Sequence, residues 1–184
     1  MANWCVKSPS DDRYQCIAWA ACRTDALMWP HEWYKWFPGL PLVEIDVEAP
    51  VDYFVQGFAV LGYRPCESRA FEFGYQKVAI YRSDQGVTHM ARQEFFGRGW
   101  LSKLGIDGVD IFHEQLEDVA GSMSPMAGQY GMVAQVLKRS WWSALIDLSL
   151  FKCIWFALRF RLYRLWQLVA NAVRPVLEVF KAFK

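Results

Sequence analysis

Two neighbouring segments with the composition of β-strands are the features that most constrain the fold of this chain. Lys77–Arg82 and Val87–Gln93 carry valine, isoleucine, tyrosine and threonine, which favour extended backbone. The four residues between them, Ser83–Gly86, are Ser-Asp-Gln-Gly, a composition typical of a tight turn. The sequence therefore predicts an antiparallel hairpin near the middle of the chain.

Further strands are expected after this hairpin. A second turn at Gly97–Gly99 leads into Trp100–Lys103, and Tyr130–Leu137 has the composition of another strand. Because consecutive strands joined by short turns pair as neighbours, these segments predict an antiparallel meander.

Two helices are expected before the meander. Asp12 is a suitable N-cap and Gln15 follows three residues later, as in a capping box, so Cys16 falls in the first helical turn. Val51–Leu61 has apolar residues at helical spacing and ends at Gly62. Helices followed by an antiparallel sheet predict an α+β domain.

Charge divides the chain at about residue 137. Residues 138–184 hold nine Lys or Arg and two acidic residues, whereas residues 1–137 hold 11 basic and 17 acidic residues. An acidic body argues against nucleic-acid binding, and a basic tail favours anionic partners such as phospholipid headgroups. We therefore expect a folded domain over residues 1–137 and a helical tail over residues 138–184.

The five cysteines contain no CxxC pair, so neither a disulfide framework nor a zinc-ribbon site is expected. His, Cys and acidic residues do not repeat at ligand spacing, and we expect no metal and no cofactor. The first residues lack the charged start, apolar run and cleavage site of a secretory signal, which predicts a cytoplasmic protein.

A cysteine nucleophile is the main hypothesis for a site. The first turn of a helix favours a thiolate because its free N–H groups stabilise negative charge, and Cys16 occupies that place. A base must take the thiol proton, and His89 in a central strand is the best placed histidine. His31 lies in an aromatic loop and His113 follows the last hairpin, so both fit less well.

These residues also resemble known families. The pattern QCIAWA, KVAIY, THMARQ, WLSKLG and DIFH, spread over most of residues 14–137, resembles an uncharacterised bacterial domain family with no established activity. A cysteine on a helix and then a histidine after a V-A-I-Y strand is similar, in order alone, to the NlpC/P60 peptidases of the papain-like superfamily. This resemblance implies a papain-like α+β fold, with Cys16 as nucleophile and His89 as base.

The NlpC/P60 resemblance also implies a polar residue that orients the imidazole from a neighbouring strand. Gln93, Ser102 and Lys103 are the alternatives, although a cation beside an imidazolium makes Lys103 the poorest. Gln15 beside the nucleophile either contributes to an oxyanion hole or serves only the helix cap. The competing interpretation is that Cys16 is a small core residue and His89 a hydrogen-bonded core histidine.

The sequence of the tail predicts a long amphipathic helix from Trp141 to Val173, with a kink or stop at Pro175. Its longest charge-free run is nine residues, whereas a transmembrane helix needs about 20, so spanning is disfavoured. Lipid or partner contact is expected from its aromatic and arginine side chains. These are Trp141, Trp142, Trp155, Arg159, Arg164, Trp166 and Arg174.

The sequence therefore favours a cysteine hydrolase or acyl-transfer enzyme that uses Cys16 and His89. Its amphipathic helix would place it on the inner face of a membrane, at anionic lipid, or in a homo-oligomer. The alternatives are a non-enzymatic, membrane-associated binding or effector module and an assembly protein that oligomerises through the tail.

Overall fold

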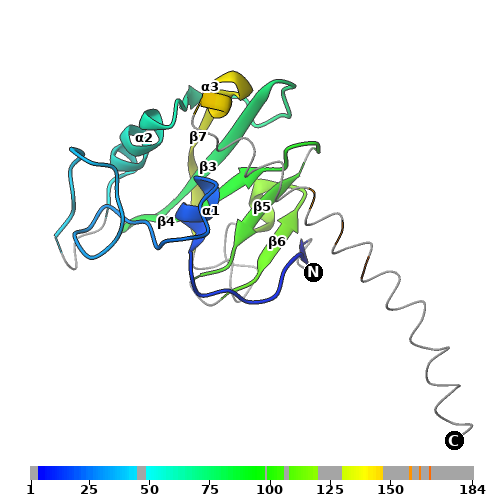
Figure 1. The fold of residues 1–184 in the computed structure, drawn as a ribbon, viewed down its shortest axis with the longest axis horizontal. Helices are drawn as coiled ribbons and strands as arrows, with labels where there is room; N and C mark the ends of the chain where they lie inside the picture. The colour runs from blue at the N-terminus through cyan, green and yellow to red at the C-terminus, as the bar shows by residue number, and fades with distance from the viewer. Residues whose placement is uncertain are drawn as a thin grey trace, which may run out of the picture.

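The computed structural model describes residues 4–44, 49–97, 99–105, 108–119 and 130–146, together with Leu158, Leu162 and Trp166. Within these residues, seven strands form one antiparallel sheet in the order β1-β6-β5-β4-β3-β7-β2 (Figure 1). The strands are β1 (Trp4–Val6), β2 (Arg64–Cys66), β3 (Tyr75–Ser83), β4 (Gly86–Gln93), β5 (Trp100–Lys103), β6 (Asp110–His113) and β7 (Met132–Ser140). The helices are α1 (Cys16–Ala20), α2 (Val51–Val60), α3 (Trp141–Ile146) and the 3-10 turn η1 (Leu116–Asp118).

The predicted hairpin and meander are confirmed. β3 pairs with β4 through the turn after Ser83, whose hydroxyl accepts a hydrogen bond from the Gln85 N–H at 3.1 Å. β5 and β6 continue the sheet on one side of this hairpin, and β7 pairs along β3 on the other. The long strands β3, β4 and β7 therefore form the centre of the fold.

The predicted papain-like α+β fold is wrong, because the domain is mainly β and its helices are short. α1 has five residues and ends at Ala20, with Ala21 as its C-cap, after which Cys22 adopts a left-handed φ of 60°. Its N-cap is Gln15, without a side-chain cap hydrogen bond, so the capping box proposed for Asp12 does not form. Most of the core is therefore built on the sheet.

The predicted helix over Val51–Leu61 is confirmed as α2. Pro50 forms its N-cap with extended backbone, and Gly62 beyond its end has a φ of +82°, which favours glycine. Phe54 and Phe58, four residues apart on one face of the helix, are fully buried against the sheet. α2 therefore packs on the same face of the sheet as α1.

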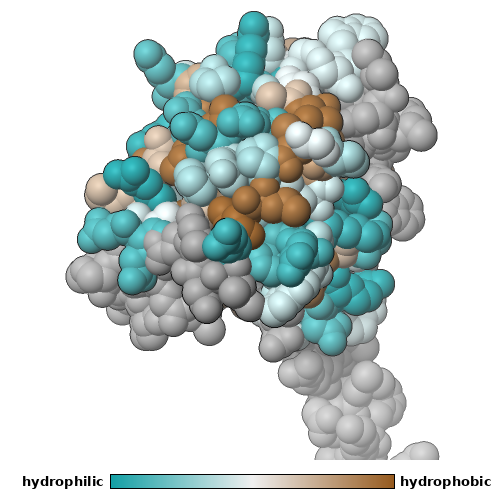
Figure 2. Space-filling model, turned by 90° about the vertical axis from the view of Figure 1, so that its left-hand side faces the viewer, coloured by the Kyte–Doolittle hydropathy of each residue, from teal (hydrophilic) through white to brown (hydrophobic). Residues whose placement is uncertain are grey.

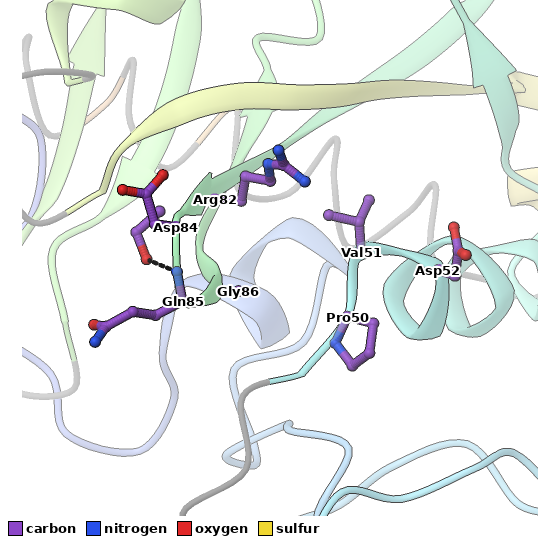
Figure 3. Close-up of a pocket in the computed structure, with 8 residues that line it drawn as sticks. Pro50, Val51, Asp52, Arg82, Asp84, Gln85 and Gly86 are labelled. Atoms are coloured by element: carbon purple, nitrogen blue, oxygen red, sulfur yellow. Dashed lines mark hydrogen bonds between the residues drawn. The ribbon is translucent and has the colours of Figure 1, made fainter.

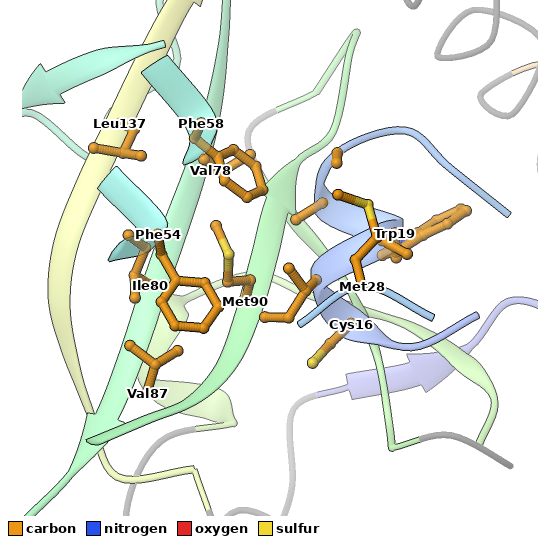
Figure 4. Packing of buried hydrophobic residues seen from close by; sticks show 14 of the residues in the cluster. Cys16, Trp19, Met28, Phe54, Phe58, Val78, Ile80, Val87, Met90 and Leu137 are labelled. Carbon is orange, nitrogen blue, oxygen red and sulfur yellow. The ribbon is translucent and has the colours of Figure 1, made fainter. Parts of the chain in front are cut away.

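Hydrophobic side chains fill both faces of the sheet. On the first face, α1 and α2 pack on alternate residues of the central strands, among them Val78, Ile80 and Met90 (Figure 4). On the second face, the cluster contains Ala79, Tyr81 and Ala91, which alternate with the first set along the same strands. A residue of β3 or β4 is thus assigned to a face by its position in the strand.

The surface carries hydrophobic residues in separate groups surrounded by hydrophilic side chains on the face shown in Figure 2. Beyond Ile146, the predicted tail helix is described only at Leu158, Leu162 and Trp166, which are helical and exposed. The tail residues Trp155, Arg159, Arg164 and Arg174 lie outside the described residues. In the described part of the chain, we find no helix with the length and apolarity to cross a bilayer.

Candidate functional site

Cys16 is the first residue of α1, as predicted, and its thiol is free. The residue is buried, with 6% of its surface exposed. Burial raises the pKa of the Cys16 thiol to about 11, although the backbone N–H groups of Met90, Ile17 and Cys16 itself act in the opposite direction. The thiol is therefore protonated at neutral pH.

A pocket of about 300 Å³ opens beside this thiol. Its walls come from five segments of the chain and are mainly apolar and aromatic. They comprise Gln15, Cys16, Leu27, Trp29, Tyr34, Thr88, Gly105 and Tyr130. Such a pocket is at the small end of the range for ligand sites.

Gln15 has no free amide for an oxyanion hole. Its side-chain Nε2 donates to the Met28 carbonyl, and its Oε1 accepts from the Met28 N–H at 2.9 Å. Both polar ends of this buried amide are thus used to hold the segment after α1. Gln15 therefore holds the segment that carries the pocket-wall residues Leu27 and Trp29.

His89 belongs to the second face of the sheet. It pairs with Tyr81 in the β3–β4 register, whereas its neighbour Met90 packs on the first face with Cys16. His89 is fully buried, and burial, followed by the nearby His113, lowers its pKa to about 3. Among the described residues, neither ring nitrogen has a hydrogen-bond partner.

Tyr130 connects the two predicted catalytic residues. Its ring stacks on His89 with centroids 4.1 Å apart, and it also lines the pocket beside Cys16. The Thr88 hydroxyl donates to the Tyr130 carbonyl at 2.6 Å and fixes this segment to β4. The sequence indicated Tyr130 only as the start of a strand, since nothing local to the residue marks it as a pocket wall.

Ser102 contacts a different histidine from the predicted one. Its hydroxyl lies 2.9 Å from Nε2 of His113, and Nδ1 of His113 lies 2.7 Å from the Gln115 carbonyl. Because a carbonyl only accepts, Nδ1 carries the proton and Ser102 donates to Nε2. Ser102 and His113 are both fully buried, so this pair is a satisfied core network.

The other two orienting candidates also have their own partners. Gln93 Nε2 donates to the Arg69 carbonyl at 3.1 Å. Lys103 is buried, donates to the Gly108 carbonyl at 2.6 Å, and lies 4.8 Å from the centre of the Tyr14 ring. Both side chains hold segments of the fold together, and neither makes a described hydrogen bond to His89.

The pKa values of Cys16 and His89 disfavour a thiolate–imidazolium ion pair between the two side chains. A thiolate–imidazolium pair needs a thiol more acidic than the imidazolium, whereas these pKa values are about 11 and about 3. In this state the two groups are a neutral thiol and a neutral imidazole.

Groups of three or more His, Cys, Asp or Glu side chains suited to a metal are absent from the residues that the structure describes.

A second hollow of about 410 Å³ lies between the β3–β4 hairpin and the start of α2 (Figure 3). Asp52, Arg82 and Asp84 contribute its charged side chains, and all three are exposed. Because water screens such charges, this hollow offers a weaker site than the pocket beside Cys16.

Comparison with known families now adds to this geometry. A family model described as a domain of unknown function, DUF7689, matches residues 5–138. The chain belongs to the DUF7689 family. This match agrees with the expected membership of an uncharacterised domain family, and it gives no link to the NlpC/P60 peptidases. No curated protein and no solved structure matches the chain.

The DUF7689 match includes both Cys16 and His89, and its last residue lies within β7. It therefore covers the pocket walls and almost the whole sheet. The basic tail lies beyond it.

Proposed function

We propose that the DUF7689 domain of this protein is a binding module for a small, largely apolar ligand, held in the pocket beside Cys16. The supporting observation is the character of that pocket, in which Trp29, Tyr34 and Tyr130 surround a protonated thiol. Aromatic walls favour apolar groups, and the Thr88 hydroxyl and backbone groups provide a few polar contacts. A volume of about 300 Å³ suits a ligand the size of a single substituted ring.

The test is ligand-observed NMR with a collection of single-ring aromatic and branched aliphatic compounds. Tyr34→Ala removes a partly exposed wall, and we expect it to weaken binding about tenfold while the fold remains intact. Trp33→Ala is the matched control, since Trp33 is 68% exposed and is not among the pocket walls. Failure of every compound to bind the wild-type protein, or equal binding by Tyr34→Ala, would contradict the proposal.

A cysteine hydrolase or acyl-transfer activity, as in the NlpC/P60 resemblance, is the second candidate function. What favours it is backbone hydrogen bonding from Met90, Ile17 and Cys16, which acts to lower the pKa of the thiol and would stabilise a thiolate once formed. The thiolate would attack an acyl carbon, the leaving group would depart with a proton, and water would release the acid from the thioester. His89 is the candidate acceptor for the thiol proton, and this step requires a rearrangement that brings the two side chains together, because they lie on opposite faces of the sheet.

The enzyme candidate is tested with p-nitrophenyl acetate and intact-mass detection of an acylated protein. An acyl group located on Cys16 by peptide mapping, absent in Cys16→Ser and slowed in His89→Gln, supports the activity. Equal acylation of the exposed Cys5 and of Cys16 would show only the general reactivity of thiols. Binding of apolar compounds without acylation favours the non-enzymatic module.

We also propose that the protein is cytoplasmic and peripheral on a membrane. The excess of basic residues over residues 138–184 supports this, because such segments are attracted to anionic lipid. Vesicle flotation tests it, and the rival is a homo-oligomer formed through the tail. Oligomers that depend on protein concentration and form without lipid would favour the rival.

A further inference from the structure

Five aromatic side chains gather where the folded domain meets the basic tail. Trp141 is their centre, with the Phe73 ring at 4.9 Å edge-on and the Phe95 ring at 4.6 Å stacked. Phe96 packs edge-on against Phe95 at 4.6 Å, and Trp142 follows Trp141 in α3. We call these five residues, from three separate segments, the aromatic patch.

The aromatic patch is open to solvent on its outer side. Phe73 is 80% exposed, Trp142 is 78% exposed and Phe96 is 51% exposed. Isolated exposed aromatic residues need no explanation, but ring contacts join the patch residues of the three segments, with Trp142 next to Trp141 in the chain, and a contiguous set marks a contact surface. Tryptophan and phenylalanine are also the side chains that enter the headgroup region of a bilayer most readily.

The charges around the aromatic patch favour one occupant. Glu72, next to Phe73, forms ion pairs with Lys138 at 2.9 Å and Lys77 at 3.4 Å, which offset its negative charge. Beyond Trp142 the chain continues into the basic tail, where residues 143–184 hold seven Lys or Arg and two acidic residues. An apolar contact surface beside a strongly basic segment complements an anionic lipid surface.

We propose that the aromatic patch is the part of the folded domain that enters the headgroup region of an anionic membrane. This inference deepens the proposed peripheral localisation and rests on it. Leu158, Leu162 and Trp166, each helical and exposed and spaced four residues apart in the sequence, are the tail side chains that would join this contact.

β4 leads from the ligand pocket to the aromatic patch. Thr88, near the start of β4, lines the ligand pocket, whereas Phe95 in the aromatic patch follows the end of the same strand. The strand from Thr88 to Gln93 alone spans roughly 17 Å. The pocket and the aromatic patch therefore lie toward opposite ends of β4.

The experiment is flotation of the full chain with phosphatidylcholine vesicles containing or lacking phosphatidylserine. The variant Phe73→Ser/Trp142→Ser removes two exposed rings, and Trp33→Ser removes a ring elsewhere that is also mostly exposed, at 68%. We expect the double variant to bind phosphatidylserine vesicles at least about tenfold more weakly than wild type, and Trp33→Ser to bind unchanged. Near-UV circular dichroism verifies that each variant is folded.

Each other outcome of the flotation experiment contradicts a separate part of the proposal. Wild-type binding with an equally strong double variant rejects the aromatic patch and leaves the peripheral tail in place. No binding by the wild type rejects both. If the double variant instead abolishes a dimer that forms without lipid, the patch contacts a second copy of the chain and the membrane inference is wrong.

Discussion

Tyr130 stacks on His89 with ring centroids 4.1 Å apart and at the same time lines the pocket beside Cys16. The ring thus covers an imidazole whose nitrogens have no hydrogen-bond partner among the described residues. An unsatisfied buried polar group costs about 1–3 kcal/mol, and stacking between aromatic rings is one way for the fold to tolerate it. This relationship makes Tyr130 the first residue to change.

Replacing Tyr130 with alanine removes the stacked ring and opens a route for water to His89. We expect the pKa of His89 to rise from about 3 toward its ordinary value, because its desolvation is the main cause of the low pKa. NMR titration of the imidazole measures this change. Tyr130→Phe keeps the ring and serves as the control, with a low pKa retained. An unchanged pKa in Tyr130→Ala would show that other groups exclude water from His89.

His89 should also determine much of the loss of unfolding free energy at acid pH, the acid limb of the stability profile. Its folded pKa of about 3 lies below the ordinary value of 6.5, so the unfolded chain binds more protons between these pH values. The free energy of unfolding is therefore highest above pH 6.5 and falls by up to about 5 kcal/mol, on account of His89, as the pH is lowered toward 3. His89→Phe should flatten this limb in urea unfolding measured across pH.

Part of the limb should persist in His89→Phe, because burial also lowers the pKa of His113. His113→Asn is therefore the companion variant, and both changes together should flatten the limb further. An acid limb of wild-type steepness in His89→Phe would contradict the assigned burial of a neutral His89.

Gln15 should prove structural. Gln15→Ala leaves the N–H and carbonyl of Met28 without their partner, which we expect to cost about 2–4 kcal/mol of unfolding free energy. Chemical denaturation measures the loss. Gln85→Ala, an exposed position in the β3–β4 turn, is the control and should change stability by less than about 0.5 kcal/mol. A stable Gln15→Ala with altered acylation would return Gln15 to the oxyanion hole.

Ser102 should act on His113 and not on the predicted dyad. Ser102→Ala leaves Nε2 of the buried His113 without its donor, and we expect a loss of about 1–2 kcal/mol in unfolding free energy. The nitrogen chemical shifts of His113 should change, whereas alkylation of Cys16 by iodoacetamide should keep its wild-type rate at each pH. A slower Cys16 reaction in this folded variant would connect Ser102 to the thiol.

Local patterns in the sequence predicted much of the secondary structure. The hairpin depends on Ser83–Gly86, α2 ends before Gly62, and β7 follows from its composition, because turn chemistry and side-chain spacing act within a few residues. The predicted cap at Asp12 was wrong, and the short length of α1 was not predicted. Gln15 bonds to Met28, 13 residues away, and no local pattern reports such a partner.

The site was predicted in part. Cys16 at the start of a helix was correct and places the thiol beside a pocket. The pairing of Cys16 with His89 remains a proposal, since the strand register assigns His89 to the second face of the sheet and Tyr130 lies against it. A segment's composition shows that it forms a strand, but long-range pairing decides which neighbours its side chains meet.

The sequence by itself determined the antiparallel hairpin, the charge division near residue 137 and the position of Cys16 on a helix. Each of these depends on residues close together in the chain or on a simple count. Only the tertiary structure decided the sheet order, the face of His89, the Ser102–His113 pair and the aromatic patch. These features join residues far apart in the chain, and packing and burial select them from many partners that local chemistry allows.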